Sequence, residues 1–497
     1  MKASIIPLGL SAALAAVIPL QRPLLQCDQS EKQPLCVDSR GSSTDPSIAL
    51  RTAVVDPEER GLGFDTSQQW SGYLDLGNDA NLFFWMFESR RDPANDPVIL
   101  WLGGDPGVSS LLGALEQWGP KRMLNNGSFV NNPAALNEVA TIIFLDHLVG
   151  TGFSYSTQDT DTHSTGKSSI DVVHFLEAFV RTSFGGKTFS GRELHIGGEY
   201  YAGHYVPSIA RAIMSRPPDD RFNLKSIMIG NGWVDTLTQQ KTIYQQLCDA
   251  ELTSNLEQML TDDECNHRLR NLRECEQSIV ECRRDATRCT QLEERCSGSD
   301  APNHNSVRYH ERGELSEHRY CERSRHNSDD GKAHLKNHLL DARVSLGVDA
   351  TMFDGGKQAW KLDHPGTLKF FRDSGDYTQN SIPDLGALLS TAESGIHVLL
   401  FAGTEYLKAP YLGTKAVAQK IDWHGQEAFN KATQAPHYAE LGSLDGDTYG
   451  EYIKVSDSES RTLMSVGLYG AGDTTDEKTG VQVKALLYQW IFDPGYF

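Results

Sequence analysis

The chain has 497 residues, which is enough for about three average domains or for one large α/β protein with insertions. Its 46 basic and 66 acidic residues give a formal charge of −20. A surface of this sign repels nucleic acid and anionic membranes, so neither is expected as a partner, and the charge is typical of secreted and vacuolar proteins.

The N-terminal segment has the features of a secretory signal peptide. Residues 1–20 begin with Lys2, continue in an apolar run and contain small residues up to Ala16. The run is short and holds two prolines, which argues against a membrane span and favours cleavage near Ala16. No later stretch is long and apolar enough to cross a bilayer. We therefore expect a protein of the secretory pathway, either secreted or vacuolar.

Residues 21–60 are polar and lack periodicity, which indicates a pro-segment or a loosely packed N-terminal arm. The fold is expected to begin at residue 61. Residues 70–76 and 82–89 are rich in β-formers and flank the turn signal of residues 77–81, so they predict a hairpin. The continuous apolar run of residues 97–102 predicts a strand buried on both faces.

Similar apolar runs alternate with helical patterns through the rest of the chain. The strands are expected at residues 141–145, 226–229, 397–401 and 463–468 and at the start of 194–207, and two of the helices at 169–184 and 481–492. This alternation predicts an α/β fold with a mostly parallel sheet and helices on both faces. The charged, cysteine-rich residues 237–347 break the alternation and are assigned to an inserted helical lid. The α/β core is then 61–236 and 348–497.

The stretch from Leu194 to Pro207 reads as a strand, a tight glycine turn and a helix. Its Gly198-Glu-Tyr-Tyr-Ala202 turn keeps the frame of the Gly-x-Ser-x-Ala/Gly nucleophile elbow, but Tyr200 stands at the nucleophile position. The stretch resembles the serine carboxypeptidase family, the relatives of carboxypeptidase Y, whose elbow reads Gly-Glu-Ser-Tyr-Ala-Gly-His-Tyr. The resemblance extends over further blocks in family order: Phe87–Pro93, Trp101–Ser110, Val149–Ser156, Ile229–Gly232 and Tyr469–Gly472.

This resemblance implies an α/β-hydrolase fold, and it also shows that the catalytic triad is substituted. The family's catalytic aspartate position holds Tyr406, and its histidine position holds Asp473. A phenol at position 200 is bulkier than a serine hydroxymethyl, and its oxygen would miss the oxyanion hole. Without an imidazole there is also no base with a pKa near working pH.

The ligand pocket implied by the resemblance is altered as well. It comprises Gly103, Gly104, Asp105, Gln117, His147, Glu199 and Tyr201. Gly103 replaces the family's asparagine, and Asp105 places a negative charge where an oxyanion would form. Gln117 replaces the glutamate that pairs with the elbow glutamate, here Glu199. His147 would form a new acid–base or metal-binding cluster with Asp105, Glu199 and Asp473, or these are polar substitutions tolerated after catalysis was lost. No metal-ligand spacing is visible, so neither a metal nor a cofactor is expected.

Nine cysteines behind a signal peptide indicate an oxidising compartment, and the lack of paired Cys-x-x-Cys motifs favours disulfides over zinc. The family resemblance implies the pairs Cys248–Cys265, Cys275–Cys296 and Cys282–Cys289. Cys27 and Cys36 are expected to pair with each other. Cys321 is left over, and it is either free or paired with an N-terminal cysteine instead. The sequon at Asn126 predicts N-glycosylation of a surface loop.

These observations predict a serine carboxypeptidase homologue that has lost peptide hydrolysis and has a binding or regulatory role. A peptide or a small molecule in the old pocket would be its ligand. One alternative is an active serine carboxypeptidase, which needs a nucleophile that the sequence does not provide. The other is a repurposed enzyme that uses His147 and the acidic cluster.

Overall fold

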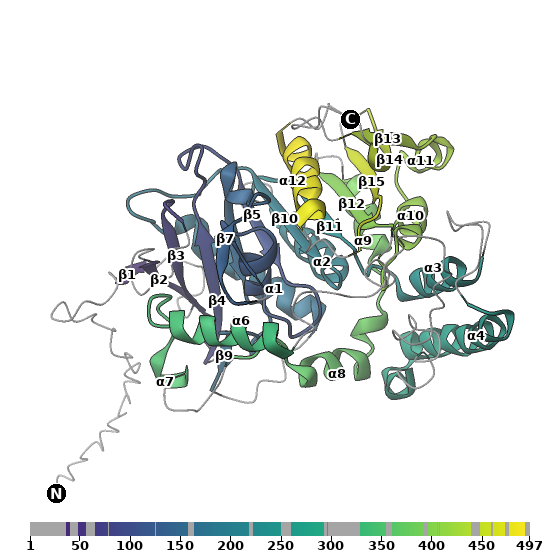
Figure 1. Ribbon diagram of the computed structural model, residues 1–497, viewed down its shortest axis with the longest axis horizontal. Coiled ribbons are helices and arrows are strands. Elements are labelled where there is room, and N and C mark those ends of the chain that lie inside the picture. The colour runs from purple at the N-terminus through teal and green to yellow at the C-terminus, as the bar shows by residue number, and fades with distance from the viewer. Residues whose placement is uncertain are drawn as a thin grey trace, which may run out of the picture.

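The computed structural model describes residues 36–39, 48–55, 65–77, 79–124, 126–157, 164–217, 222–249, 260–292, 296, 329–353, 360–391, 396–404, 406, 408–438, 448–458, 461–472 and 477–492. Within these ranges one large sheet forms the centre of the molecule (Figure 1). Its strand order is β1-β2-β3-β4-β8-β5-β10-β11-β12-β15-β14-β13, and β9 pairs with β4. The predicted signal peptide and the predicted Cys27–Cys36 pair lie outside the described residues and side chains.

The centre of the sheet is parallel, as the apolar runs predict. Its strands in spatial order are β8 (Thr141–Leu145), β5 (Val98–Leu102), β10 (Leu194–Glu199), β11 (Leu224–Gly230), β12 (His397–Gly403) and β15 (Thr462–Leu468). Because these strands are buried on both faces, they read as continuous apolar segments rather than as alternating ones.

Both ends of the sheet are antiparallel. One end holds β1 (Cys36–Ser39), β2 (Ala49–Val55), β3 (Gln69–Asp75), β4 (Ala80–Phe87) and β9 (Tyr155–Ser156), and the other holds β14 (Thr448–Ser456) and β13 (Ala435–Tyr438). The predicted hairpin of β3 and β4 is present. A separate small hairpin consists of β6 (Lys121–Met123) and β7 (Phe129–Asn131).

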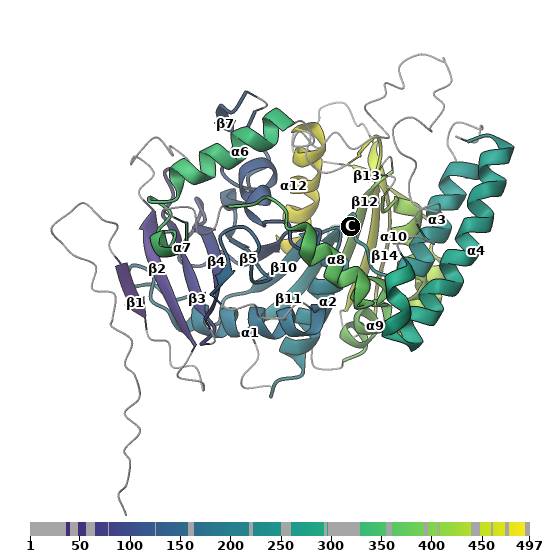
Figure 2. The same ribbon diagram turned by 90° about the horizontal axis from the view of Figure 1, so that it is seen from below.

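Helices cover both faces of the sheet, with α1 and α2 on one side and α6 and α12 on the other (Figure 2). The first layer contains α1 (Thr165–Arg181), α2 (Ala202–Met214), α9 (Ile382–Ser390) and α10 (Tyr411–Lys420). The second contains α12 (Glu477–Phe492), the short η2 turn (Gly113–Gln117) and α6 (Asp329–Ala342). Val172, Phe175, Leu176 and Phe179 of α1 are all buried, which confirms the apolar side read from the sequence.

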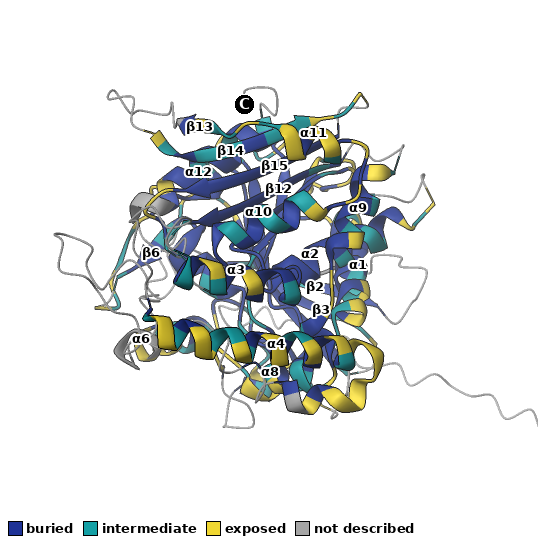
Figure 3. Cartoon of the chain, turned by 90° about the vertical axis from the view of Figure 1, so that its right-hand side faces the viewer, coloured by how far each residue is buried: buried dark blue, intermediate teal, exposed yellow. Residues whose placement is uncertain are grey.

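The predicted disulfide-rich insertion is helical and contains α3 (Thr236–Cys248), α4 (Asp262–Arg284) and the η5 turn (Ala286–Gln291) before α6. The bonds Cys248–Cys265, Cys275–Cys296 and Cys282–Cys289 are all present, as the family resemblance implies. Helix α4 presents an exposed face to solvent and buries its cysteines on the other (Figure 3). Cys321 lies outside the described residues.

Two boundaries drawn from the sequence do not match the packing. Strand β2 pairs along its whole length with β3, so the sheet extends into the segment assigned to an N-terminal arm. Helix α6 buries Leu335 and Leu339 in the core of the second layer, and Ser71 Oγ donates to the carbonyl of Leu346 at 2.8 Å. The C-terminal part of the insertion therefore belongs to the core.

The remaining short helices connect these layers. They are η3 (Leu136–Glu138), α7 (Ala350–Phe353), α8 (Pro365–Asp373), the η7 turn (Asp376–Thr378) and α11 (Gln426–Lys431). In the part of the chain that the structure describes, no helix has the length and apolarity needed to cross a bilayer.

Candidate active site

The candidate site is built on the sharp turn between β10 and α2. Tyr200 sits in this turn with a φ of +50°, a left-handed conformation that is rare for an aromatic residue. Its N–H donates to Gly230 O at 3.0 Å, and its carbonyl accepts from Trp233 N at 2.7 Å. A Cβ on Gly198 would lie 2.6 Å from the Cβ of Ala202, so the close approach of strand and helix requires glycine. The sharp strand–turn–helix geometry of an elbow is therefore present, with Tyr200 in its turn.

The side chain of Tyr200 is engaged within the protein. Its hydroxyl lies 3.0 Å from the hydroxyl of Tyr377, and its ring packs near the indole of Trp233 with centroids 6.0 Å apart. Burial, the neighbouring phenol of Tyr377 and the carboxylate of Asp105 hold the pKa of Tyr200 well above its ordinary value. The phenol is thus neutral at physiological pH, and a neutral phenol is a poor nucleophile.

Tyr406 lies beside Tyr200, at the position predicted for the family's aspartate. It follows β12, its N–H donates to Gly403 O at 3.4 Å, and its phenol adds to the upward shift of the Tyr200 pKa. The loop after β15 reaches the same place, since a Cβ on Gly403 would lie 2.2 Å from Ala471 O. Asp473, two residues further on, lies outside the described residues. Tyr200 and Tyr406 therefore both lie near the carboxyl edge of the sheet, where open α/β folds place their sites.

The loop that follows β5 passes directly beside the elbow. A Cβ on Gly104 would lie 3.2 Å from Glu199 O and 3.3 Å from the Cβ of Tyr200. Gly103 is tied to the far part of the same loop, because its N–H donates to Ser110 Oγ at 2.7 Å. A Cβ at Gly103 would lie 2.9 Å from Val108 O, so the asparagine expected here from the family requires a different loop path. Asp105 is near enough to the elbow to raise the pKa of both Tyr200 and Tyr205.

Gln117 and Glu199 are joined by a hydrogen bond. Gln117 Nε2 donates to Glu199 Oε2 at 2.8 Å across a partly buried interface between η2 and the end of β10. The amide N–H of a glutamine can donate to an ionised carboxylate. Two carboxyl groups in the same place could form a hydrogen bond only if one of them were protonated.

His147 is not arranged as a base or a metal ligand. It is buried, it packs edge-on against Tyr205 with ring centroids 4.3 Å apart, and neither ring nitrogen has a hydrogen-bond partner among the described residues. Burial lowers the pKa of His147 to about 3, so the ring is neutral. Tyr201 is buried too, and its hydroxyl donates to Asp376 Oδ1 at 2.8 Å. Both side chains belong to the packing beneath the elbow.

Three site residues were not predicted from the sequence. Tyr377 and Trp233 enclose the Tyr200 ring, and Lys408 Nζ lies 5.8 Å above the centre of that ring. Trp233 directly follows the Ile229–Gly232 block of the family resemblance, so its position near the site could have been predicted from that block. Tyr377 comes from the irregular η7 turn, and no local pattern marks it.

A strained strand–turn–helix at the carboxyl edge of a parallel sheet, with helices on both faces, defines a protein of the α/β-hydrolase fold. The serine carboxypeptidase family model matches residues 58–493. The chain therefore belongs to the serine carboxypeptidase family.

The most similar proteins include several fungal carboxypeptidases. The chain is 42% identical over 224 residues to a vacuolar serine-type carboxypeptidase of Saccharomyces cerevisiae, a match that covers 45% of this chain and 42% of that relative. It is 33% identical over 432 residues to carboxypeptidase Y homolog A of Sordaria macrospora, covering 85% of this chain and 71% of the relative.

Among solved structures, a prohormone-processing carboxypeptidase of S. cerevisiae aligns with a TM-score of 0.63 and 21% identity, covering 91% of this chain and 93% of the other. This likeness shows the shared fold.

Proposed function

We propose that this serine carboxypeptidase homologue no longer hydrolyses peptides and that its former active site has a binding or regulatory role. The observation that carries the proposal is Tyr200, which occupies the nucleophile position of an intact elbow with its hydroxyl hydrogen-bonded to Tyr377 at 3.0 Å. Triad members act as a unit, and loss of any one costs orders of magnitude in rate.

The alternative of an active serine carboxypeptidase is favoured by family membership alone. It requires a serine nucleophile beside a base, and the nearby serines do not fit that role. Ser109 Oγ donates to Asp146 Oδ1 at 2.7 Å, and Ser110 Oγ donates to the carbonyl of Leu145. A repurposed enzyme that uses His147 is disfavoured because this ring is buried and neutral.

A fluorophosphonate probe together with peptide hydrolysis tests the proposal. The purified protein should show no serine labelling and no release of C-terminal residues from blocked dipeptides between pH 4.5 and 7.5. A carboxypeptidase Y preparation treated in parallel should do both. Labelling of any serine in this chain with matching turnover would establish the active-enzyme alternative.

We further infer that the protein passes through the secretory pathway. The three disulfides among the described residues and the vacuolar relative are consistent with that route. Asn126 is exposed in the turn between β6 and β7, and its Oδ1 accepts a hydrogen bond from Ser128 N at 3.0 Å. Glycosylation at Asn126 predicts a mass decrease on glycosidase treatment of the secreted protein, and N-terminal sequencing tests cleavage of the signal.

A further inference from the structure

The η7 turn joins α8 to α9 and contacts the elbow through two consecutive residues. Tyr377 places its hydroxyl 3.0 Å from that of Tyr200, and its ring stacks on Tyr201 with centroids 5.3 Å apart. Asp376 accepts hydrogen bonds from Tyr201 OH at 2.8 Å and from Thr165 N at 3.0 Å. The position of η7 therefore decides whether the hydroxyl of Tyr200 is covered.

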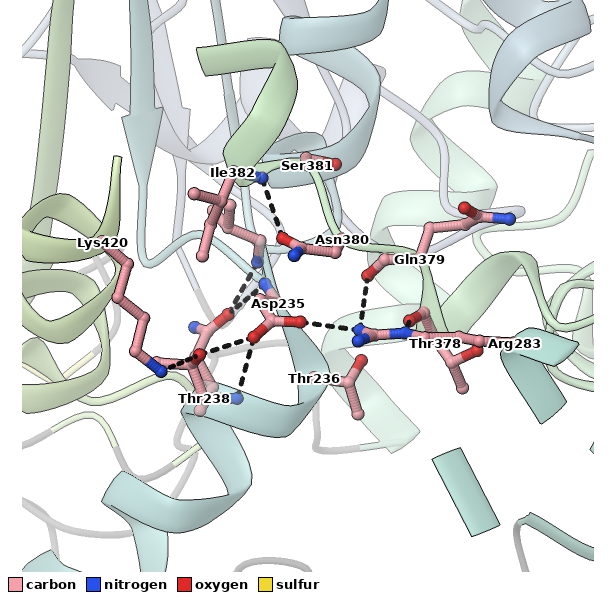
Figure 4. A network of polar contacts seen from close by, with 12 residues as sticks. Asp235, Thr236, Thr238, Arg283, Thr378, Gln379, Asn380, Ser381, Ile382 and Lys420 are labelled. Carbon is pink, nitrogen blue, oxygen red and sulfur yellow. Dashed lines mark hydrogen bonds and ion pairs between the residues drawn. The ribbon is translucent and has the colours of Figure 1, made fainter. Parts of the chain in front are cut away.

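Helix α4 of the insertion holds this turn from the opposite side through one guanidinium (Figure 4). Arg283 Nε donates to Thr378 O at 2.6 Å, and a terminal nitrogen of the same group donates to Asp235 Oδ1 at 2.6 Å. Asp235 lies just after β11 and caps α3, and its carboxylate also accepts from Thr238 N at 3.0 Å. Arg283 thus joins α4, η7 and the start of α3 in one network.

This network is shielded enough for its geometry to matter. The Asp235 side chain is 6% exposed and that of Arg283 is 28% exposed. The flat guanidinium reaches two acceptors on different elements at once, which a lysine ammonium on a flexible stem reproduces poorly. Loss of Arg283 would leave the buried Asp235 carboxylate without its charged partner and free the carbonyl of Thr378.

A disulfide supports the same turn from below. Gly375, which directly precedes η7, has a φ of +83°, and a Cβ there would lie 2.6 Å from Cys289 Sγ and 2.9 Å from Cys282 Sγ. Cys282 Sγ also lies 3.3 Å from Thr378 Oγ1. The backbone of the turn is therefore packed directly on the Cys282–Cys289 bond, which links α4 to η5.

From these contacts we propose that the disulfide-bonded insertion is a clamp that holds η7 against the elbow, so that Tyr377 caps the former nucleophile position from within the molecule. Arg283 is the positioning residue of the clamp, and Tyr377 is the cap. Release of Arg283 lets η7 move and exposes the hydroxyl of Tyr200. This inference concerns access to the site and holds whether or not peptide hydrolysis has been lost.

The full-length protein with Arg283→Gln provides the test, with Arg288→Gln as a matched control. Arg288 lies in the same insertion, but it is exposed and its ion pairs, to Glu281 and Asp285, stay within the insertion. Amide exchange measured by mass spectrometry should be at least about tenfold faster over residues 374–381 in Arg283→Gln than in the control, with α1 unchanged. Nitration by tetranitromethane should then modify Tyr200 severalfold faster. Equal exchange over residues 374–381 in the two variants would overturn the clamp.

A second variant tests the cap without disturbing the clamp. Tyr377→Phe keeps the ring and removes only the hydroxyl that faces Tyr200. Nitration of Tyr200 should rise severalfold, while exchange over residues 374–381 stays as in the parent protein. If Tyr200 stays as unreactive as before, Tyr377 is not its cap. Arg283→Gln could destabilise the whole protein and raise exchange throughout the chain. In that case Tyr377→Phe still tests whether Tyr377 covers Tyr200, because it leaves every contact of Arg283 in place.

Discussion

Tyr200 keeps a backbone conformation that only the surrounding structure can maintain. A left-handed conformation costs a residue with a Cβ roughly 1–2 kcal/mol, yet the peptide groups of Tyr200 are fixed by Gly230, Trp233 and Gly203. The strained turn that lifts a nucleophile in this fold is thus retained around a tyrosine side chain. A variant that changes only side chains should therefore keep the backbone conformation of the elbow.

We predict that this scaffold is not sufficient for catalysis, and a restored triad tests the prediction. Tyr200→Ser, Tyr406→Asp and Asp473→His together should hydrolyse peptides barely above background, because Asp105 still opposes an oxyanion. An oxyanion-hole defect typically costs about 10²–10³ in rate. Adding Asp105→Gly should raise kcat/KM much further, with Asp105→Asn as the control for charge alone. Gly103→Asn should help less, since its Cβ would lie 2.9 Å from Val108 O. An ordinary enzyme rate from the triple variant would contradict this account.

The hydrogen bond between Gln117 and Glu199 predicts a pH-dependent effect of one substitution. Gln117→Glu would place two carboxyl groups 2.8 Å apart at a partly buried site, so they would share a proton and one folded-state pKa would rise. A raised acid pKa gives stability that is present below about pH 4.3 and is lost as the pH rises through the folded value. The melting temperature of the variant, relative to the parent, should therefore fall between pH 4.5 and 7.5.

Gln277→Glu is a matched control for this measurement. Gln277 Nε2 donates to Glu281 Oε1 at 2.9 Å, almost the same separation, but on the exposed face of α4. Water and salt screen that pair, so its effect on the melting temperature should be small at every pH. Equal pH dependence in the two variants would show that the Gln117–Glu199 site is as open to solvent as a helix surface.

At the scale of elements, the insertion depends on its covalent links. Helix α4 is strongly charged, and much of its buried surface consists of the cysteines of three disulfides. Disulfides that close short loops typically contribute about 2–4 kcal/mol each. Mild reduction should therefore speed amide exchange in α4 and η5 before it affects α1 or α2. Mapping that found Cys275, Cys282, Cys289 and Cys296 as free thiols in the untreated protein would refute the pairing.

The elements also show what the sequence could and could not predict. The parallel strands, the elbow and α1 follow from local apolar patterns, and the three disulfides follow from the family resemblance. Strand β2 was missed because its burial alternates weakly within a polar segment, although Ala53, Val54 and Val55 carry a strand signal. Tyr377 could not be predicted, since its place depends on how Arg283 and a disulfide hold an irregular turn.

At the scale of the whole molecule, buried histidines link stability to pH. Burial lowers the pKa of His147, His195 and His204 to about 3 each. An unfolded histidine has a pKa near 6.5, so each stabilises the fold fully above that pH and loses its contribution as the pH falls toward 3. The contribution of each of these histidines to the free energy of unfolding should be about 2 kcal/mol smaller at pH 5 than at neutral pH.

The histidine effect is best measured as a difference between variants, because burial raises the pKa of Asp146 to about 6, which acts in the opposite direction. Denaturant unfolding of His147→Gln should lose less stability between pH 7.5 and pH 5 than the parent does, by about 2 kcal/mol. His267→Gln, on the exposed face of α4, is the control and should follow the parent. If all three proteins lost the same stability between pH 7.5 and pH 5, His147 would not be shielded from solvent as the structure indicates.

The strand order has a consequence for synthesis of the chain. Strands β11 and β12 are neighbours in the sheet, but residues 231–396 separate them in sequence. At about 5–20 residues per second, roughly 10–30 s pass between the emergence of the two strands. During that interval the apolar edge of β11 has no pairing partner, and unpaired edges of this kind recruit other chains. We therefore expect newly made protein to be most prone to association at this stage, until the second half of the sheet arrives.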